Sequence, residues 1–319
     1  MIGIADVRDA AARIEGHVRR TPVIGASQVK DPVAAGAVLS LKLELLQVTG
    51  SFKGRGATNR LLATPQERLA NGIVAASGGN HGLATARAGY LAGVRTTIFL
   101  PTNVSPAKVE KLQRWGAETI VTGEFWDETN EHALAFAEAT GAMYFHPFAD
   151  PLIVAGQGTV GLEILDQVPD IDAVLVAIGG GGLIAGVATA IKALRPEVRI
   201  VGVEATGSPT LKASLDHGGV VRLEQITTSV PTLACARTDE RIYEVVRDTV
   251  DEIVLVDDDA MRDAAGWLWF EMGLAADLSG AAALAALRQG TVTYARGERI
   301  CAIVCGAGPD ALLAPAARG

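Results

Sequence analysis

Short apolar runs alternate with stretches of helical spacing along most of the chain. The apolar runs predict strands, and the amphipathic stretches between them predict helices. Gly93, Gly116 and Gly141 lie where three of the predicted helices end, which is a typical place for glycine. Regular alternation of strand and helix is typical of a parallel, doubly wound sheet, so the pattern predicts an α/β fold.

The predicted strands cover 38–45, 73–75, 96–100, 118–122, 142–144, 173–178, 199–204, 252–256 and 299–304. The predicted helices cover 4–19, 52–62, 80–92, 105–115, 126–139, 151–167, 182–194, 209–216, 258–272 and 280–288. The stretch 218–240 is rich in threonine and is predicted to be irregular. Two successive α/β series predict two layered domains with a ligand between them. We expect the smaller domain to span 53–147 and the larger to combine 1–52 with 148–319.

Composition narrows the classes of protein that are compatible with this fold. The 319 residues are 49% hydrophobic, include 36 glycines and carry a formal net charge of −8, which argues against nucleic-acid or anionic-membrane partners. The uncharged stretch 173–191 contains four consecutive glycines, which predict a strand, a loop and a helix instead of a membrane span. Charged residues throughout 1–20 argue against a signal peptide. Three cysteines without a CxxC pair indicate reduced thiols, and we expect a cytoplasmic protein.

Lys53 has an unusual local sequence, since it lies among glycines, a phenylalanine and a serine in the motif SFKGRGA at 51–57. No acidic residue is closer along the chain than Glu44. Desolvation without a counter-charge favours the neutral amine, which can form a Schiff base with an aldehyde. The alternative is a lysine at a helix start whose amine extends to solvent.

Two glycine-containing loops each follow a predicted strand and open a helix. The first, Ser77 to Gly82, offers backbone amides and the side chains of Ser77 and Asn80 to a carboxylate. It is also compatible with an ordinary helix cap, and His81 alone is equally compatible with a structural role. The second, Gly179 to Leu183, offers side-chain-free amides at a helix start to a phosphate.

The second loop has an alternative interpretation. Gly180, Gly182 and Ala185 fit the GxGxxG/A pattern of dinucleotide-binding proteins, and Glu204 lies at about the distance expected for a ribose-binding acid. That alternative is a nicotinamide-dependent oxidoreductase. It leaves Lys53 and the Ser77–Gly82 loop without a role. A non-catalytic binding protein that keeps the fold is a further alternative.

Together these motifs resemble the fold-type II (tryptophan synthase β-like) pyridoxal-phosphate enzymes, most closely the threonine/serine dehydratases and their serine-racemase relatives. The similarity runs in order over nearly the whole chain. Its motifs are SFKGRGA at 51–57, SGGNHG at 77–82, HPFADP at 146–151, AGQGTVGLEIL at 155–165, GGGGLIAG at 179–186 and CGAG at 305–308.

The resemblance implies a role for each motif. Lys53 would hold the cofactor covalently and then remove the substrate Cα proton. Phe52 would pack near the cofactor ring, and Asn80 would hydrogen-bond the ring hydroxyl. The cofactor phosphate would bind to Gly179, Gly180, Gly181, Gly182 and Leu183, and the substrate carboxylate to Ser77, Gly78, Gly79, Asn80 and His81.

Cys305 matches the position that faces the pyridine nitrogen in the family. A thiol is a weak hydrogen-bonding partner and cannot stabilise a protonated ring as a carboxylate would, which favours prompt β-elimination. The same residue is compatible with a small buried apolar role.

Several departures from the family pattern bear on the reaction. Gly78 stands where racemase relatives have a serine that acts as the second base. Glu204 is a possible cation ligand, but Thr210 replaces the second acid of that site. The EGAG-like stretch is Asp277-Leu278-Ser279-Gly280, and the substrate-side loop at 229–232 lacks the usual Asp-Gly.

The expected activity is therefore β-elimination of water from threonine or serine, which gives a 2-oxo acid and ammonia, in a homodimer. The alternatives are a substituted 3-hydroxy amino acid as substrate, such as 3-hydroxyaspartate or an ectoine-derived compound, and a β-replacement synthase.

Overall fold

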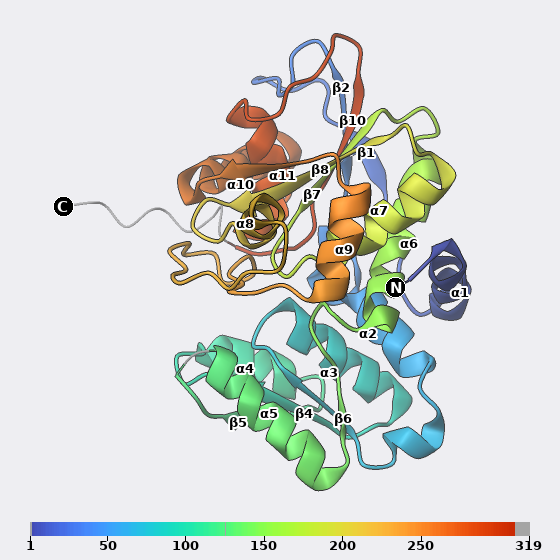
Figure 1. The fold of residues 1–319 in the computed structure, drawn as a ribbon, viewed down its shortest axis with the longest axis vertical. Helices are drawn as coiled ribbons and strands as arrows, with labels where there is room; N and C mark the ends of the chain where they lie inside the picture. Colours follow the sequence, from blue (N-terminus) through green and yellow to red (C-terminus); the bar gives the residue numbers. More distant parts are fainter. Residues whose placement is uncertain (1, 125, 310–319) are drawn as a thin grey trace, which may run out of the picture.

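The computed structural model describes residues 2–124 and 126–309. Their strands form two separate sheets, one of six strands and one of four. Figure 1 shows the sheets in opposite halves of the molecule, with helix α2 (Lys53–Leu62) where the halves meet. The predicted α/β fold with two largely parallel sheets is confirmed.

The six-stranded sheet has the order β1-β2-β10-β7-β8-β9. All neighbouring strands are parallel except β1, which pairs antiparallel with β2. β7 is buried along its whole length, as expected for a central strand covered on both faces. The strands are β1 (Val23–Gly25), β2 (Val38–Lys42), β7 (Ala173–Ala177), β8 (Arg199–Ala205), β9 (Glu252–Val256) and β10 (Arg299–Ile303).

Helices cover both faces of this sheet. In Figure 1, α10 (Asp258–Met272) and α11 (Leu278–Arg288) lie on one side, and α6 (Pro151–Gln167) and α7 (Gly182–Leu194) on the other. Alanines of α11 are buried throughout, which allows this helix to approach the sheet closely. The remaining helices of this half are α1 (Ile4–Ile14), α8 (Thr210–His217) and α9 (Glu240–Thr249).

The four-stranded sheet is entirely parallel, with the order β5-β4-β3-β6. Alternation along β3 (Ile73–Ala76) sends Ile73 and Ala75 into one apolar cluster and Val74 and Ala76 into another. The first cluster includes residues of α2, α3 (Asn80–Ala92) and α4 (Pro106–Gln113), and the second includes Ala133 of α5 (Trp126–Thr140). The other strands are β4 (Thr96–Leu100), β5 (Glu118–Val121) and β6 (Met143–Tyr144).

The elements differ from the prediction most in four places. Strand β2 ends at Lys42, short of the predicted end at residue 45, because Glu44–Leu46 form a short 3-10 helix. The first helix ends at Ile14, because Glu15 leaves the helical conformation and Gly16 has a φ of 75°. The short edge strand β1 was not predicted. Helix α9 was not predicted either, although Asp239 caps it by accepting a hydrogen bond from the Arg241 amide.

Both glycine-containing loops follow the carboxyl end of a parallel strand. Residues 77–79 connect β3 to α3, and residues 178–181 connect β7 to α7. This is the side of a parallel sheet on which α/β proteins bind ligands. Among the described helices, none has both the length and the apolar character needed to cross a bilayer.

Candidate active site

Lys53 is the first residue of α2, and its amine lies among neutral groups. Nζ donates a hydrogen bond to the Pro147 carbonyl at 2.6 Å and lies 5.1 Å from the centre of the Phe52 ring. No carboxylate of the described residues forms an ion pair with it. Burial lowers the pKa of Lys53 from 10.5 to about 8, because the charged amine is desolvated. The side chain is thus much closer to neutrality than an ordinary lysine.

The CGAG segment lies directly beside this lysine. The Phe52 amide donates to the Cys305 carbonyl at 3.2 Å, and Ser51 forms a bridge with Gly306. The buried Cys305 thiol donates to the Ser279 carbonyl at 3.4 Å, and burial raises its pKa. Cys305 is therefore a protonated thiol, and its backbone adjoins the segment that carries Lys53.

The Gly179–Leu183 loop is arranged as an anion cradle. Within the described part of the chain, none of its five backbone N–H groups donates a hydrogen bond to a protein acceptor. Gly181 has a φ of 91° and stands at the N-cap of α7. Unpaired amides at the start of a thirteen-residue helix provide a partial positive charge for a phosphate.

The segment His146–Phe148 connects this cradle to Lys53. A Cβ on Gly180 would collide with the Phe148 ring, and one on Gly182 would lie 2.6 Å from the Phe148 carbonyl oxygen. The neighbouring Pro147 carbonyl accepts the bond from Lys53. The glycines are therefore needed for close packing, which holds the cradle and the lysine in a fixed relation.

His146 is a well-anchored member of the same segment. Its Nδ1 accepts hydrogen bonds from the amides of Phe148 and Ala149 at 3.2 and 2.9 Å, which places the proton of the neutral ring on Nε2. Burial, reinforced by the charge of Lys53, lowers the pKa of His146 to about 4. The sequence motifs indicated no role for this residue beyond membership of HPFADP.

The Ser77–His81 loop has unpaired donors of its own. The Ser77 hydroxyl oxygen accepts a bond from the Gly79 amide at 3.3 Å. Within the described residues, the amides of Gly78, Asn80 and His81 donate no bond to the protein. They are therefore available to a carboxylate at the start of α3.

His81 cannot contribute a positive charge to this loop. Its Nε2 lies 2.9 Å from the Phe145 carbonyl oxygen and donates to it, and burial lowers its pKa to about 3. The neutral ring therefore fixes the loop against Phe145, directly after β6, and the part of His81 left for a ligand is its amide.

Asp277 joins the Ser77–His81 loop to the other half of the molecule. Its Oδ2 accepts a bond from the Asn80 side-chain amide at 3.2 Å, and its Oδ1 accepts from the Gly280 amide at 2.6 Å. In the sequence this stretch stood out only as a departure from the family pattern. The Asp-x-x-Gly spacing at a helix start predicts the cap, but not the contact with Asn80.

Glu204, the possible cation ligand, is fully buried in β8. Its two oxygens accept bonds from the amides of Leu211 and Lys212 at 2.8 and 2.9 Å, and burial raises its pKa to about 7. The Thr210 hydroxyl donates to the Cys235 carbonyl. Within the described residues, no group of three or more His, Cys, Asp and Glu side chains could hold a metal ion.

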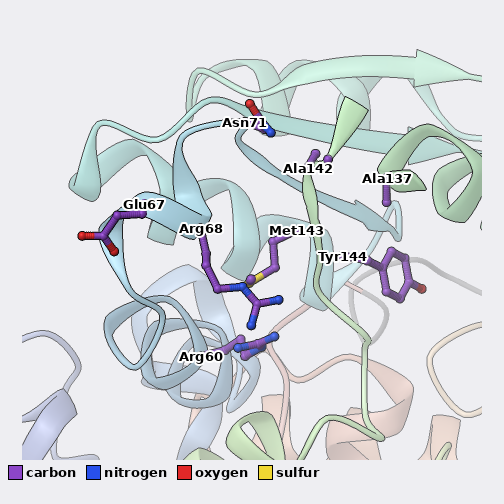
Figure 2. Close-up of a pocket in the computed structure, with 9 residues that line it drawn as sticks. Arg60, Glu67, Arg68, Asn71, Ala137, Ala142, Met143 and Tyr144 are labelled. Carbon is purple, nitrogen blue, oxygen red and sulfur yellow. The ribbon is translucent and has the colours of Figure 1, made fainter. Parts of the chain in front are cut away.

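A pocket of about 450 Å³ lies elsewhere, on the half that carries the four-stranded sheet. Figure 2 shows Arg60 and Arg68 pointing toward each other beside Met143. Arg60 is already paired with Asp150 at 2.6 Å. None of the predicted site residues lines this pocket, so it is separate from the lysine site.

A desolvated lysine near two loops with unpaired amides at helix starts fits one class of protein: an enzyme that binds a phosphorylated aldehyde cofactor. Its residues fit pyridoxal phosphate, because within residues 2–124 and 126–309 Lys53 has no anionic partner and the Gly179–Leu183 amides have no acceptor. A model of the family described as pyridoxal-phosphate dependent enzyme matches residues 14–306. The chain belongs to this family, and pyridoxal phosphate is its cofactor. The dinucleotide alternative is therefore wrong.

Individual relatives agree with this assignment. L-threonine ammonia-lyase of Geobacter sulfurreducens is 40% identical over 297 residues, which are 93% of this chain and 73% of the relative. The enzyme of the same name from Thermotoga maritima is 37% identical, over 97% of this chain and 76% of the relative. Within its family the chain is a lyase similar to the threonine ammonia-lyases.

Solved structures give the same result for the fold. Maize serine racemase has a TM-score of 0.90 at 36% identity, over 96% of this chain and 93% of that one. The processed form of threonine deaminase isoform 2 from Solanum lycopersicum has a TM-score of 0.89 at 33% identity, over 95% and 89% of the two chains. The fold-type II architecture expected from the sequence motifs is confirmed.

Proposed function

We propose that this protein removes water from a β-hydroxy-α-amino acid, threonine or serine, and releases a 2-oxo acid and ammonia. The observation that carries the proposal is Lys53, which has no anionic partner in the part of the chain that the structure describes. Pro147–Phe148 link it to the Gly179–Leu183 loop, whose amides are unpaired in the same part of the chain. The threonine ammonia-lyases among its relatives support the choice of reaction.

Each group of the site has one proposed task. Bound pyridoxal phosphate supplies an aldehyde for amino groups and an electron sink for the substrate Cα. Lys53 would hold it covalently and then take the Cα proton as the base. Gly179–Leu183 would bind the phosphate through backbone amides, and Phe52 would pack near the ring.

Two further side chains would contact the cofactor ring. Asn80 would donate its second amide hydrogen to the ring hydroxyl, because its first is directed at Asp277. Cys305 would face the ring nitrogen with a neutral sulfur, since burial keeps its proton in place and the thiol donates to Ser279. A neutral partner leaves the ring nitrogen unprotonated, which favours prompt elimination.

The Ser77–His81 loop would bind the substrate carboxylate. Ser77 would donate its hydroxyl, and Gly78, Asn80 and His81 their backbone amides, to this anion at the start of α3, while the Gly79 amide stays bonded to the Ser77 hydroxyl oxygen. Because the His81 ring is neutral, the affinity for the carboxylate would come from amide dipoles and not from a charge pair.

Gly78 favours elimination over racemisation. Racemisation needs a second base on the opposite side of the substrate, and Gly78 has no side chain to supply it. A Cβ at Gly78 would lie 3.3 Å from both Leu100 and Val104, so even a serine there would displace apolar neighbours. Lys53 is left as the base for the Cα proton.

A substrate panel tests this function directly. Purified enzyme loaded with cofactor is mixed with L-threonine, L-serine and L-threo-3-hydroxyaspartate, and 2-oxo acid and ammonia are measured. We expect equal amounts of both products from threonine or serine. If only 3-hydroxyaspartate or an ectoine-derived hydroxy amino acid is turned over, that compound replaces threonine and serine as the assigned substrate. Product only with an added thiol or other nucleophile would indicate a β-replacement synthase.

We also propose a homodimer with a cytoplasmic location, and a smaller domain that spans 53–147. Free thiols at Cys235, Cys301 and Cys305 support a reducing compartment. The separate four-stranded sheet, whose strands all lie between residues 73 and 144, supports the domain boundaries. Sedimentation analysis tests the dimer, and limited proteolysis near residues 53 and 147 tests the boundaries.

A further inference from the structure

One residue, Thr232, lies against both glycine-containing loops. A Cβ on Gly79 would be 3.9 Å from Thr232 Cγ2, and a Cβ on Gly179 would be 2.8 Å from the Thr232 carbonyl oxygen. Gly79 belongs to the proposed carboxylate loop, and Gly179 to the proposed phosphate loop. Thr232 therefore lies where the two loops come together, with its methyl group toward the carboxylate loop.

The backbone around Thr232 is held firmly on its amino-terminal side. Asp258 accepts hydrogen bonds from the Thr228 hydroxyl and the Ser229 amide, both at 2.6 Å. Val230 is buried in the large apolar core, and its carbonyl accepts a bond from the Leu233 amide at 3.0 Å. The segment therefore has little freedom to move away from the loops.

Its carboxyl-terminal side is held as well. The Cys235 amide donates to the Ser208 hydroxyl oxygen at 3.0 Å, and the Cys235 carbonyl accepts from the Ser208 hydroxyl at 3.1 Å. Leu233 is buried, whereas Thr232 is exposed. In the described part of the chain, the Thr232 hydroxyl makes no hydrogen bond. A fixed backbone thus presents a free threonine side chain beside the proposed substrate loop.

The charges near this segment are already paired. Arg237 pairs with Glu240 and Arg241 with Asp239, each at 3.0 Å, and Arg222 pairs with Asp127. Between residues 222 and 241, all of which the structure describes, no arginine is left for a second substrate carboxylate. An anionic group on the substrate β-carbon would therefore meet no unpaired arginine of this segment.

We infer that Thr232 determines which substrates this enzyme accepts, by limiting the β-carbon substituent to a small, uncharged group. The inference rests on the proposed function, because it places the substrate carboxylate on the Gly79 loop. The Cα and the β-carbon of the substrate lie within one or two bonds of the carboxylate carbon. The Thr232 methyl, which lies beside the carboxylate loop, would therefore limit the size of the β-carbon substituent. Serine and threonine fit this limit, whereas 3-hydroxyaspartate and aryl-substituted serines do not.

Turnover by variants of the full-length holoenzyme tests the limit. Wild type should prefer L-threonine over L-threo-3-hydroxyaspartate and over 3-phenylserine in kcat/KM by about 100-fold. Thr232→Gly should narrow the preference over phenylserine by about tenfold or more, because it removes the bounding methyl. Thr232→Arg should narrow the preference over 3-hydroxyaspartate by a similar factor, because it supplies a cation. Thr232→Val keeps the shape and should keep the wild-type preferences.

Binding of unreactive amino acids provides a test that needs no turnover. The visible absorbance of the holoenzyme is titrated with L-2-aminobutyrate and with L-aspartate, and melting temperatures verify that each variant is folded. Wild type should bind L-2-aminobutyrate more tightly than L-aspartate, and Thr232→Arg should reduce or reverse this difference in affinity.

The outcomes separate the two proposals. Absence of turnover for every β-hydroxy amino acid would overturn the proposed function, while the binding preference would still test Thr232. Equal preferences in wild type, Thr232→Gly and Thr232→Arg would overturn the role of Thr232, whatever the reaction is.

Discussion

Burial lowers the pKa of both Lys42 and Lys53, but of the two only Lys42 has an anionic partner among the described residues. Lys42 is fully buried, and its Nζ donates to Glu163 at 2.5 Å and to Gln167 and the Thr21 carbonyl at 2.8 Å. Lys53 is only partly buried, and its Nζ donates to the neutral Pro147 carbonyl. The lysine whose residue is less exposed is therefore the one with more partners.

The partners of Lys42 belong to a network with balanced charge. Arg55 pairs with Glu44 at 2.8 Å and with Glu163 at 2.7 Å, so that two cations meet two carboxylates between β2, α2 and α6. Glu163 opposes the effect of burial on the pKa of Lys42. Burial alone thus does not make a lysine reactive. A missing counter-charge does, and Arg55 anchors the helix that presents Lys53.

The largest expected effect is a difference in turnover between variants of Lys42 and Lys53. Lys53→Met should reduce turnover by about 1,000-fold or more, because it removes both the covalent attachment and the base. Lys42→Met should retain most of the turnover per folded molecule, since Lys42 belongs to the framework. Oxo-acid assays on both variants measure this. Near-normal turnover by Lys53→Met would contradict the assignment.

The second effect is a difference in the free energy of unfolding between variants of Lys42 and Lys53. Lys42→Met should lower the free energy of unfolding by at least about 3 kcal/mol, because it removes a cation from a buried network and leaves a carboxylate in excess. Lys53→Met should leave the stability of the apoprotein unchanged or raise it, since it removes a desolvated amine that has no counter-charge. Urea denaturation of the two apoproteins decides this. Equal destabilisation would refute the contrast.

A smaller effect tests whether the Gly179–Leu183 loop requires a residue without a side chain at Gly180. Gly180→Ala should cost about 1–3 kcal/mol in stability or in cofactor affinity, because the new methyl collides with Phe148. Gly266→Ala is the matched control, since nothing lies within 4 Å of its Cβ position in helix α10. It should stabilise the protein by about 0.5–1 kcal/mol. Similar behaviour of both variants would show that the cradle tolerates side chains.

The smallest effect is a pH dependence of cofactor loading. Lys53 loses its proton as the pH rises through about 8, so the neutral fraction that attacks an aldehyde increases up to that point. The rate of covalent attachment to the apoprotein should rise about tenfold per pH unit below this value and then level off. Stopped-flow visible absorbance follows it. A rate that still rises toward pH 10.5, the ordinary lysine pKa, would show a solvated amine.

Local sequence was sufficient to predict most elements and the two loops. Strand-to-helix boundaries around Asn80 and Gly182 are marked by glycines, and both helices begin and end where predicted. Helix α9 was missed because its threonine-rich flank suggested irregular structure, although Asp239 and the apolar spacing of Ile242, Val245 and Val246 mark a capped amphipathic helix.

Contacts between distant residues could not be predicted from local patterns. Lys42 and Glu163 are 121 positions apart, and Asn80 and Asp277 are 197 apart. Their sequence surroundings do not specify which carboxylate each will meet, so local sequence did not indicate that Lys42 is paired with Glu163. The position of Thr232 between the two loops depends in the same way on tertiary packing.

Borohydride trapping tests whether Lys53 is the lysine that holds the cofactor. The reagent makes the attachment of an aldehyde cofactor to a lysine permanent, and peptide mass mapping then locates it among the chain's seven lysines, which are Lys30, Lys42, Lys53, Lys108, Lys111, Lys192 and Lys212. One cofactor per chain is expected on Lys53, and none in Lys53→Met. A label on Lys42 or another lysine, or no label on a holoprotein that absorbs in the visible, would contradict this expectation.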